Sequence, residues 1–397
     1  MKLPCFAKKA IICFFLVYFT AISASYAFSN EDCHWADWII KLNTSVFYVK
    51  NDDLIDIYGL CNGKIIKKCN YKIKNSSDLL GIQLDSGLNC YRITKKPDCL
   101  RISIIELLSG NVIDEKVISG VRDVSAADSV IISPDGRKLA TFKMSRIEPL
   151  VGNVSIYQIS DLLSRNNKND SFIAGNPQML ISGWLPGASV SPDFCNAALI
   201  NTESNVRKAI VNSGKGKYIS VKGKISFCHS WNSSGTEFIY TRLNKKNGKY
   251  KMKKTSFITG KESDTAFPEF STEPKSVEAD NSRIVVLLDK RSLYFEQDGK
   301  CRCMKLPFDT FSLRLYPEKP QILALCKTGN ELRPVIFDVS STIPVEILKL
   351  PAVENNPKNN DERIWELKLT TSLLSIGWIP HSKLVYVRNN EKYFFSP

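Results

Sequence analysis

Apolar residues in this chain recur in short runs separated by turn sequences, and almost nowhere at the three- and four-residue spacing of a helix. The clearest unit begins with the apolar run 130–132, continues through a Ser-Pro-Asp-Gly turn at 133–136, and ends with two β-prone segments, 138–143 and 154–159. Proline presets φ at the second position of such a turn, and glycine takes the positive φ that closes it. This pattern predicts a series of short antiparallel strands.

The same kind of turn recurs downstream, each time just before a run of apolar residues. It is found at 191–193, 232–235, 279–281, 316–318 and 379–381. Three of the intervals between successive turns are close to the ~40–45 residues of a four-stranded propeller blade, and the two longer intervals contain polar inserts. We therefore expect an all-β chain that folds as a single β-propeller of about six to seven four-stranded blades.

Two of these segments resemble a known repeat. Residues 133–140 read Ser-Pro-Asp-Gly-Arg-Lys-Leu-Ala, and residues 231–240 read Trp-Asn-Ser-Ser-Gly-Thr-Glu-Phe-Ile-Tyr. Both are similar to the repeat of TolB-like propellers, and the resemblance covers about residues 125–390. It implies the blade architecture and a preference for protein partners. Within one propeller domain, 28–397, we expect divergent, cysteine-rich blades in 28–124 and clearer repeats in 125–397.

The first 27 residues have the pattern of a secretory signal. Lys2, Lys8 and Lys9 precede the uncharged apolar run 10–22, which is too short to cross a hydrocarbon core of about 30 Å as a helix. A small-x-small site for signal peptidase ends at Ala27. We expect cleavage after residue 27, no later membrane-spanning segment, and a periplasmic or secreted protein. An uncleaved membrane anchor is the alternative.

Cysteines are numerous, twelve in all, and two of them lie in the signal. The other ten are Cys33, Cys61, Cys69, Cys90, Cys99, Cys195, Cys228, Cys301, Cys303 and Cys326. An even count in an exported chain favours disulfides, so we expect a disulfide-stapled propeller whose connectivity the sequence leaves open. Cys301 and Cys303 point to the same face of one predicted strand, so each should bond elsewhere, for example to Cys326. No C-x-x-C pair occurs, and no metal site is expected.

The formal net charge of +14 favours association with anionic surfaces. Lysines are densest in 244–254, where Lys249, Lys251 and Lys253 alternate along a predicted strand and so share one face. Two interpretations are open. The lysines either form a solvated strand edge that is protected from aggregation, or they bind an anionic partner. Specific recognition of nucleic acid is not expected.

His229 and Trp231 lie just before one repeat turn, where polar and aromatic side chains are candidates for ligand binding. The alternatives are a hydrogen-bonded structural role for the histidine and a wedge between neighbouring blades for the tryptophan. The chain contains no Gly-x-Ser-x-Gly elbow, glycine-rich phosphate loop or His-Glu-x-x-His motif. We therefore assign no catalytic residue and expect no cofactor.

Three hypotheses for function remain. The first is a monomeric, non-enzymatic binding or scaffold protein that engages a protein or glycan partner. The second is a propeller enzyme, lactonase-like or quinoprotein-like, whose acidic residues gather from several blades at the central channel. Sites of that kind carry no local motif. The third is a surface protein that binds polyanions.

Overall fold

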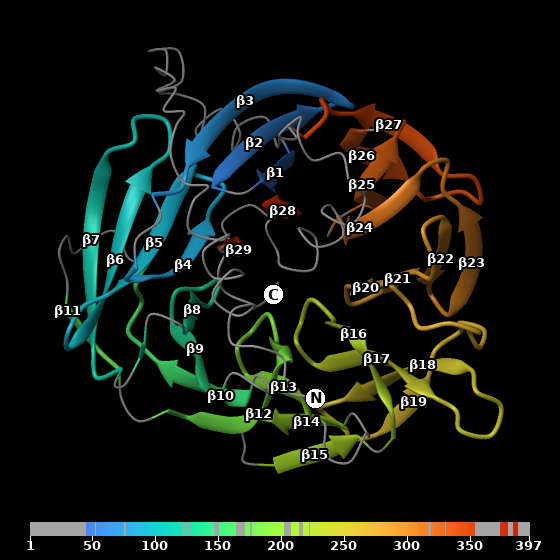
Figure 1. Cartoon of the computed structure of the whole chain (residues 1–397), viewed down its shortest axis with the longest axis horizontal. Coiled ribbons are helices and arrows are strands. Elements are labelled where there is room, and N and C mark those ends of the chain that lie inside the picture. Colours follow the sequence, from blue (N-terminus) through green and yellow to red (C-terminus); the bar gives the residue numbers. More distant parts are fainter. Residues whose placement is uncertain are drawn as a thin grey trace, which may run out of the picture.

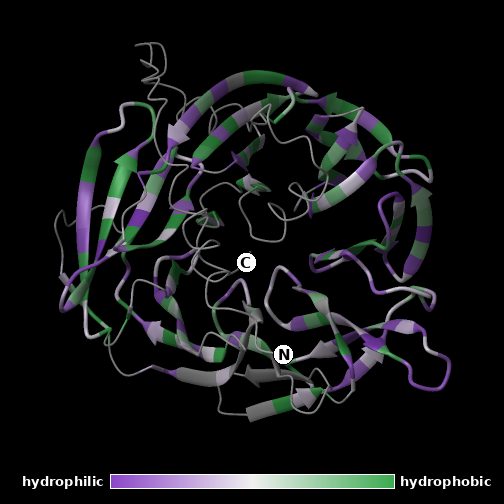
Figure 2. Cartoon of the chain, viewed as in Figure 1, coloured by the Kyte–Doolittle hydropathy of each residue, from purple (hydrophilic) through white to green (hydrophobic). Residues whose placement is uncertain are grey.

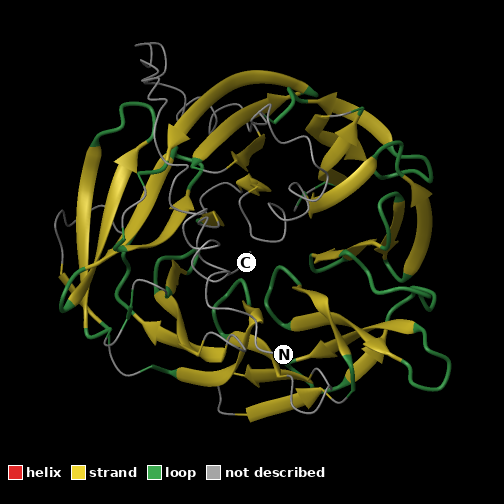
Figure 3. Cartoon of the chain, viewed as in Figure 1, coloured by secondary structure: helices red, strands yellow, loops and turns green. Residues whose placement is uncertain are grey.

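The structure, a computed structural model, is a ring of β-sheets around a central axis (Figure 1). It describes residues 45–51, 53–74, 77–121, 124–125, 128–146, 151–163, 171–174, 177–201, 208–213, 217–221, 223–316, 319–329, 331–353, 374–379 and 384–387. These residues form strands and loops and no helix (Figure 3). A helix long and apolar enough to cross a membrane is accordingly not found among them.

Four of the six sheets have four strands each. In order of pairing they are β28 (Leu374–Ile379), β1 (Ser45–Asn51), β2 (Leu54–Cys61) and β3 (Lys64–Lys72); β16 (Ile225–Trp231), β17 (Glu237–Leu243), β18 (Tyr250–Ser256) and β19 (Glu262–Asp264); β20 (Ser276–Ala279), β21 (Arg283–Leu287), β22 (Ser292–Gln297) and β23 (Lys300–Lys305); and β24 (Asp309–Leu315), β25 (Gln321–Thr328), β26 (Glu331–Asp338) and β27 (Val345–Lys349).

The other two sheets are larger. One contains β11 (Ser171–Ile173), β7 (Val112–Ser119), β6 (Cys99–Glu106), β5 (Asn89–Lys95), β4 (Leu79–Leu84) and β29 (Val385–Val387); the other contains β15 (Lys217–Val221), β14 (Lys208–Ser213), β13 (Asn196–Asn201), β12 (Met179–Val190), β10 (Val151–Gln158), β9 (Lys138–Arg146) and β8 (Ser129–Ile132). The first part of β12 pairs with β10, and its last part pairs with β13. This seven-stranded sheet therefore consists of two four-stranded units that share β12. The expected all-β propeller is confirmed, with six sheets around the axis.

The two ends of the described chain close the ring. Strand β28 pairs antiparallel with β1, from Val46 opposite Ile379 to Asn51 opposite Leu374. Strand β29 adds to β4 in the neighbouring sheet, with Val385 opposite Leu84. Two sheets therefore combine early and late strands, which ties the first part of the ring to the last.

The hydrophobic core lies between neighbouring sheets. Many strands alternate apolar and polar residues, visible as green and purple bands (Figure 2), because successive side chains point to opposite faces of a sheet. Strands β4 and β21 are instead buried along their whole length. One cluster joins Leu287 and Phe295 of one sheet to Ile322 and Phe337 of the next. Similar clusters of buried residues lie between other pairs of adjacent sheets.

The repeat turns have the hydrogen bonds that their sequences predict. The Ser133 hydroxyl donates to the Asp135 carboxylate at 2.6 Å, and that carboxylate accepts from the Arg137 backbone N–H at 3.1 Å. Asp193 accepts in the same way from Ser191 and from the Cys195 backbone. Both aspartates therefore stabilise the turns in which they lie.

Three of the repeat turns also connect one sheet unit to the next. The residue that closes a turn extends its side chain to a backbone carbonyl in the following turn: Lys138 to Asp193 at 2.9 Å, Asn196 to Gly235 at 3.0 Å, and Arg283 to Tyr316 at 3.0 Å. The turns therefore connect the units around the axis as well as reversing the chain. We call these three contacts the turn bridges.

The predicted disulfides are not present among the described cysteines. No disulfide joins any two of these nine residues, which are Cys61, Cys69, Cys90, Cys99, Cys195, Cys228, Cys301, Cys303 and Cys326, and Cys33 lies outside the described residues. Cys301 packs with Phe270 and Val286 on one side of its sheet, whereas Cys326 is buried in the cluster on the other side. The suggested link between them is wrong because the sheet itself separates the two sulfurs.

Thiol titration tests whether the nine described cysteines are free. We expect the exposed Cys195 and Cys303 to react rapidly in the native protein. Burial raises the pKa of Cys90 and of Cys326 to about 12 each, so these two should react only after unfolding. Thermal unfolding should be the same with and without reductant, since each native disulfide would contribute ~2–4 kcal/mol. A melting temperature several degrees lower in reductant would show that the native protein contains a disulfide.

Candidate functional site

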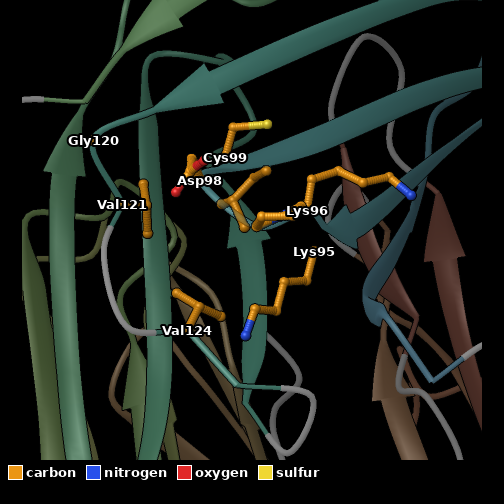
Figure 4. Close-up of a pocket in the computed structure, with 9 residues that line it drawn as sticks. Lys95, Lys96, Asp98, Cys99, Gly120, Val121 and Val124 are labelled. Atoms are coloured by element: carbon orange, nitrogen blue, oxygen red, sulfur yellow. The ribbon is translucent and has the colours of Figure 1, made fainter.

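The candidate site is a pocket where two loops meet at one edge of the six-stranded sheet. Strands β5, β6 and β7 are antiparallel neighbours, so the ends of β5 and β7 lie at the same edge. The pocket has a volume of about 550 Å³. Its lining consists of Lys95, Lys96, Pro97, Asp98, Cys99, Leu100, Gly120, Val121 and Val124 (Figure 4).

The first wall of the pocket is the tight turn between β5 and β6. Pro97 supplies the restricted φ and Asp98 the polar residue that such turns favour. The turn is closed by a hydrogen bond from the Lys96 backbone N–H to the Cys99 carbonyl, at 2.9 Å. A second bond, from the Lys95 N–H to the Asp78 carbonyl at 2.7 Å, holds the turn against the incoming chain. The backbone therefore fixes where the neighbouring side chains begin.

The charges along this wall differ in how they are paired. The Lys96 ammonium lies 3.4 Å from the Asp78 carboxylate and points away from the two valines of the pocket (Figure 4). For Lys95 and Asp98, no ion-pair partner occurs in the described part of the chain. This wall thus carries one cation and one anion without an ion-pair partner among the described residues.

The opposite wall and the floor are aliphatic. Leu100, Val121 and Val124 are buried in the cluster between the six- and seven-stranded sheets. Gly120, between β7 and this wall, has a φ of +87°, and a β-carbon there would lie 2.3 Å from the Ala174 carbonyl oxygen. Glycine at position 120 allows the chain to turn from β7 toward Val121 with Ala174 packed against it.

His229 and Trp231 belong to a different place, on the inner strand β16. Nε2 of His229 lies 3.0 Å from the Ser189 hydroxyl oxygen, and Nε1 of Trp231 donates to the same oxygen at 2.9 Å. Both rings pack on Phe238, with centroids 5.0 Å away in each case. Ser189 lies on β12, so the two side chains connect neighbouring sheets. This geometry suits the structural roles considered for them, and their role in binding stays a prediction.

The three lysines of the predicted anionic site lie on and just before β18, which pairs with β17 on one side and β19 on the other, and acids lie beside two of them. Lys251 and Lys253 both form ion pairs with Asp264 of β19, and Lys253 also lies 3.5 Å from Glu262. Lys249 is exposed in the turn before β18. Strand β19 therefore neutralises much of the charge that the sequence pattern singles out. Binding of an anion by these lysines stays a prediction.

The pairing of these lysines predicts a change in acid stability. Hydrogen bonds from Lys251 and Lys253 lower the pKa of Asp264 below its ordinary 3.8. A carboxyl group whose pKa is lowered by folding stabilises the folded chain at pH values above its ordinary pKa. That stability is lost as the pH falls through the lowered pKa. The double variant Lys251→Gln, Lys253→Gln should therefore be less stable than the wild type at neutral pH, with the difference shrinking toward about pH 3.

Urea unfolding at the two pH values measures this effect, with Lys249→Gln as the matched control because its side chain is exposed. The control should behave like the wild type at both pH values. A double variant that matches the wild type at neutral pH would show that the ion pairs add no stability.

Another charged pair joins the inner strands of two neighbouring sheets. Arg314 of β24 forms an ion pair with Glu278 of β20, and both side chains are partly buried. Burial raises the pKa of Glu278, and Arg314 acts in the opposite direction. Glu278 is thus held by a guanidinium. Within the described ranges, no group of three or more His, Cys, Asp or Glu is placed to hold a metal ion.

Apart from Cys99, which was expected to form a disulfide, the pocket residues are absent from the site predicted by sequence. The two halves of the pocket come from parts of the chain that are far apart, residues 95–100 on one side and residues 120, 121 and 124 on the other, and neither carries a motif for chemistry. One signal was available: the turn sequence Lys-Lys-Pro-Asp-Cys at 95–99 combines opposite charges with a tight turn.

No family model matches the chain, and no curated protein matches its sequence. Several solved structures are similar. An uncharacterised protein from Listeria monocytogenes EGD-e has a TM-score of 0.45 and 10% identity, covering 79% of this chain and 93% of that one. The dihydro-heme d1 dehydrogenase NirN has a TM-score of 0.44 and 12% identity, with coverages of 88% and 84%. TolB from Acinetobacter baumannii has a TM-score of 0.37 and 13% identity, with coverages of 84% and 88%. The TolB-like character of the repeats stays a prediction.

Proposed function

We propose that this chain is an exported, non-enzymatic binding protein that engages a protein partner through the pocket at β5–β6 and the loops beside it. One observation supports this most directly: a pocket of about 550 Å³ joins an aliphatic floor to two charged groups, Lys95 and Asp98. Ligand sites commonly have volumes of ~300–1,000 Å³ and combine an apolar lining with a few polar groups. The aliphatic floor suits a peptide side chain better than a glycan, whose hydroxyl groups would lose hydrogen bonds with water.

Export is the second part of the proposal. It rests on the signal pattern in residues 1–27, which lie outside the described residues. We expect the protein recovered from the periplasm or the medium to begin at Phe28, as N-terminal sequencing would show. Recovery of a chain that retains residues 1–27 in the membrane fraction would favour the uncleaved anchor instead.

Capture of a partner tests the binding function. The mature chain is immobilised and exposed to an extract of the native envelope at low and at high salt. We expect a discrete protein that stays bound at high salt, because an aliphatic contact is not weakened by ionic screening. The variant Cys99→Phe places a ring in the pocket and should reduce the recovery of that protein about tenfold.

A matched variant controls for the added ring. Cys303 is an exposed cysteine on the outer strand β23 of another sheet, so Cys303→Phe adds the same ring away from the pocket. It should capture the partner like the wild type. Equal capture by Cys99→Phe and the wild type would place the binding surface elsewhere, and loss of the partner at high salt would favour the lysine-rich surface.

A further inference from the structure

Lys138 and Cys195 are in contact across the two units of the seven-stranded sheet. Lys138 begins β9, and Cys195 lies in the turn that ends just before β13. The Lys138 nitrogen lies 2.9 Å from the Cys195 sulfur and 2.9 Å from the Asp193 carbonyl oxygen. We propose that Lys138 and Cys195 form a covalent crosslink when a peroxide oxidises the Cys195 thiol. This modification is independent of the proposed binding function.

Hydrogen bonds hold both reactive atoms in place. The Cys195 backbone N–H donates to the Asp193 carboxylate at 3.0 Å, which fixes the residue that carries the sulfur. The carbonyl of the same aspartate accepts from the Lys138 ammonium, which directs the lysine side chain to this turn. Two groups held in contact react as if at a very high concentration, because the entropy of bringing them together is already lost. The lysine nitrogen therefore competes well with solvent for an activated sulfur.

The Cys195 sulfur is accessible to an oxidant. Its thiol is free and the residue is exposed, and exposure favours oxidation of a thiol to a sulfenic acid. A second thiol usually resolves a sulfenic acid as a disulfide. No disulfide joins Cys195 to another of the nine described cysteines, whereas the Lys138 nitrogen is in contact with it. The contact therefore favours a bond to nitrogen once an oxidant is supplied.

The crosslink forms in two steps. First, the thiol attacks hydrogen peroxide: an S–O bond forms, the O–O bond breaks, and the second oxygen leaves as water. The sulfur is oxidised by two electrons and the peroxide is reduced by two. Second, the lysine ammonium releases one proton to solvent and its nitrogen attacks the sulfur. An N–S bond forms, the S–O bond breaks, and the hydroxyl group leaves with a second nitrogen-bound proton as water. Sulfenic acids condense with backbone nitrogen in the same way.

The crosslink would join two units of the ring covalently. Lys138 and Cys195 are 57 residues apart in sequence, and the contact of Lys138 with Asp193 is one of the turn bridges. A crosslink between distant residues restricts the unfolded chain and so favours the folded one. We expect peroxide to raise the melting temperature of the wild type by about 5 °C relative to an equally treated Cys195→Ser variant. Dithiothreitol should remove the difference.

Peptide mapping detects the bond directly and needs no variant. The mature chain is reduced, freed of reductant, treated with hydrogen peroxide, digested without reductant and analysed by mass spectrometry. We expect a peptide that joins the segments around Lys138 and Cys195, with two hydrogen atoms fewer than the separate segments. It should separate in dithiothreitol. One additional oxygen atom in the joined peptide would also support the crosslink, as an N–O–S linkage that consumes a second molecule of peroxide.

Lys138→Arg is the matched variant. Arginine keeps the positive charge, but its guanidinium stays protonated and does not attack the sulfur. Dimedone, which traps sulfenic acids, should label Cys195 in this variant at least about tenfold more than in the wild type. Cys303 is the internal control, because it is exposed and has the Tyr294 hydroxyl as a hydrogen-bond partner. Its labelling should be equal in the two proteins.

Either of two results would overturn the inference. The first is equal dimedone labelling of Cys195 in the wild type and in Lys138→Arg, with no joined peptide in the wild type. The second is a joined peptide in which Cys195 is bonded to a residue other than Lys138.

Discussion

Replacing Arg283 by alanine is expected to destabilise the folded chain by about 3 kcal/mol. Arg283 forms an ion pair with Asp280 within its own turn, and its guanidinium donates to the Tyr316 carbonyl of the next turn at 3.0 Å. The side chains of Arg283 and Asp280 are only 7% and 9% exposed, respectively. Alanine would leave a buried carboxylate without its counterion and remove one of the turn bridges. Chemical unfolding at neutral pH measures the loss.

Arg291 is the matched control for this variant. It also pairs with an aspartate, Asp309, but its side chain is 49% exposed. Exposed ion pairs contribute about 0–1 kcal/mol, so Arg291→Ala should change the free energy of unfolding by no more than that. Equal losses in the two variants would mean that the turn bridge at Arg283 does not add to stability.

Replacing Gly81 by alanine is expected to cost about 3 kcal/mol, the upper end of the usual range for overpacking, because the backbone it would meet cannot move freely. Gly81 lies on β4, and a β-carbon at this position would be 2.3 Å from the carbonyl oxygen of Val130 on β8. The two strands belong to neighbouring sheets. The added methyl group must therefore push these sheets apart, and the melting temperature reports the effect.

Gly248→Ala separates this steric effect from the general cost of replacing glycine. Gly248 has a φ of +71° in the turn before β18, and a β-carbon added there would meet no atom within 4 Å. Only the strain of a positive φ remains, about 1 kcal/mol. A Gly81 variant no less stable than the Gly248 variant would show that the two sheets can separate at little cost.

Local turn chemistry explains why the fold was predictable. Ser133, Asp135 and Gly136 form a turn through contacts among neighbours in sequence, so a pattern of residue types is sufficient to find it. The equivalent turn at 191–196 shows the limit of that pattern. Phe194 takes the position of the glycine with a φ of +53° while its ring is buried. Packing of the ring there compensates for a backbone conformation that sequence rules assign to glycine.

The errors and omissions depend on positions in three dimensions. An even number of cysteines says nothing about which side of a sheet each one faces, and Cys301 and Cys326 face different clusters. The candidate pocket was missed for a similar reason. Asp98 and Val121 have ordinary roles within their own segments and acquire a joint one only because β5 and β7 end at the same edge.

Closure of the ring by β28 and β29 has a consequence for the order of folding. The inner edges of β1 and β4 pair with strands that are made last. Until those strands arrive, both edges have unpaired backbone groups that can pair with another chain. Contacts between residues this far apart in sequence also form slowly, because a long loop must close first. Completion of the ring therefore depends on the segment between Leu374 and Val387, and a chain that ends before it keeps two open edges.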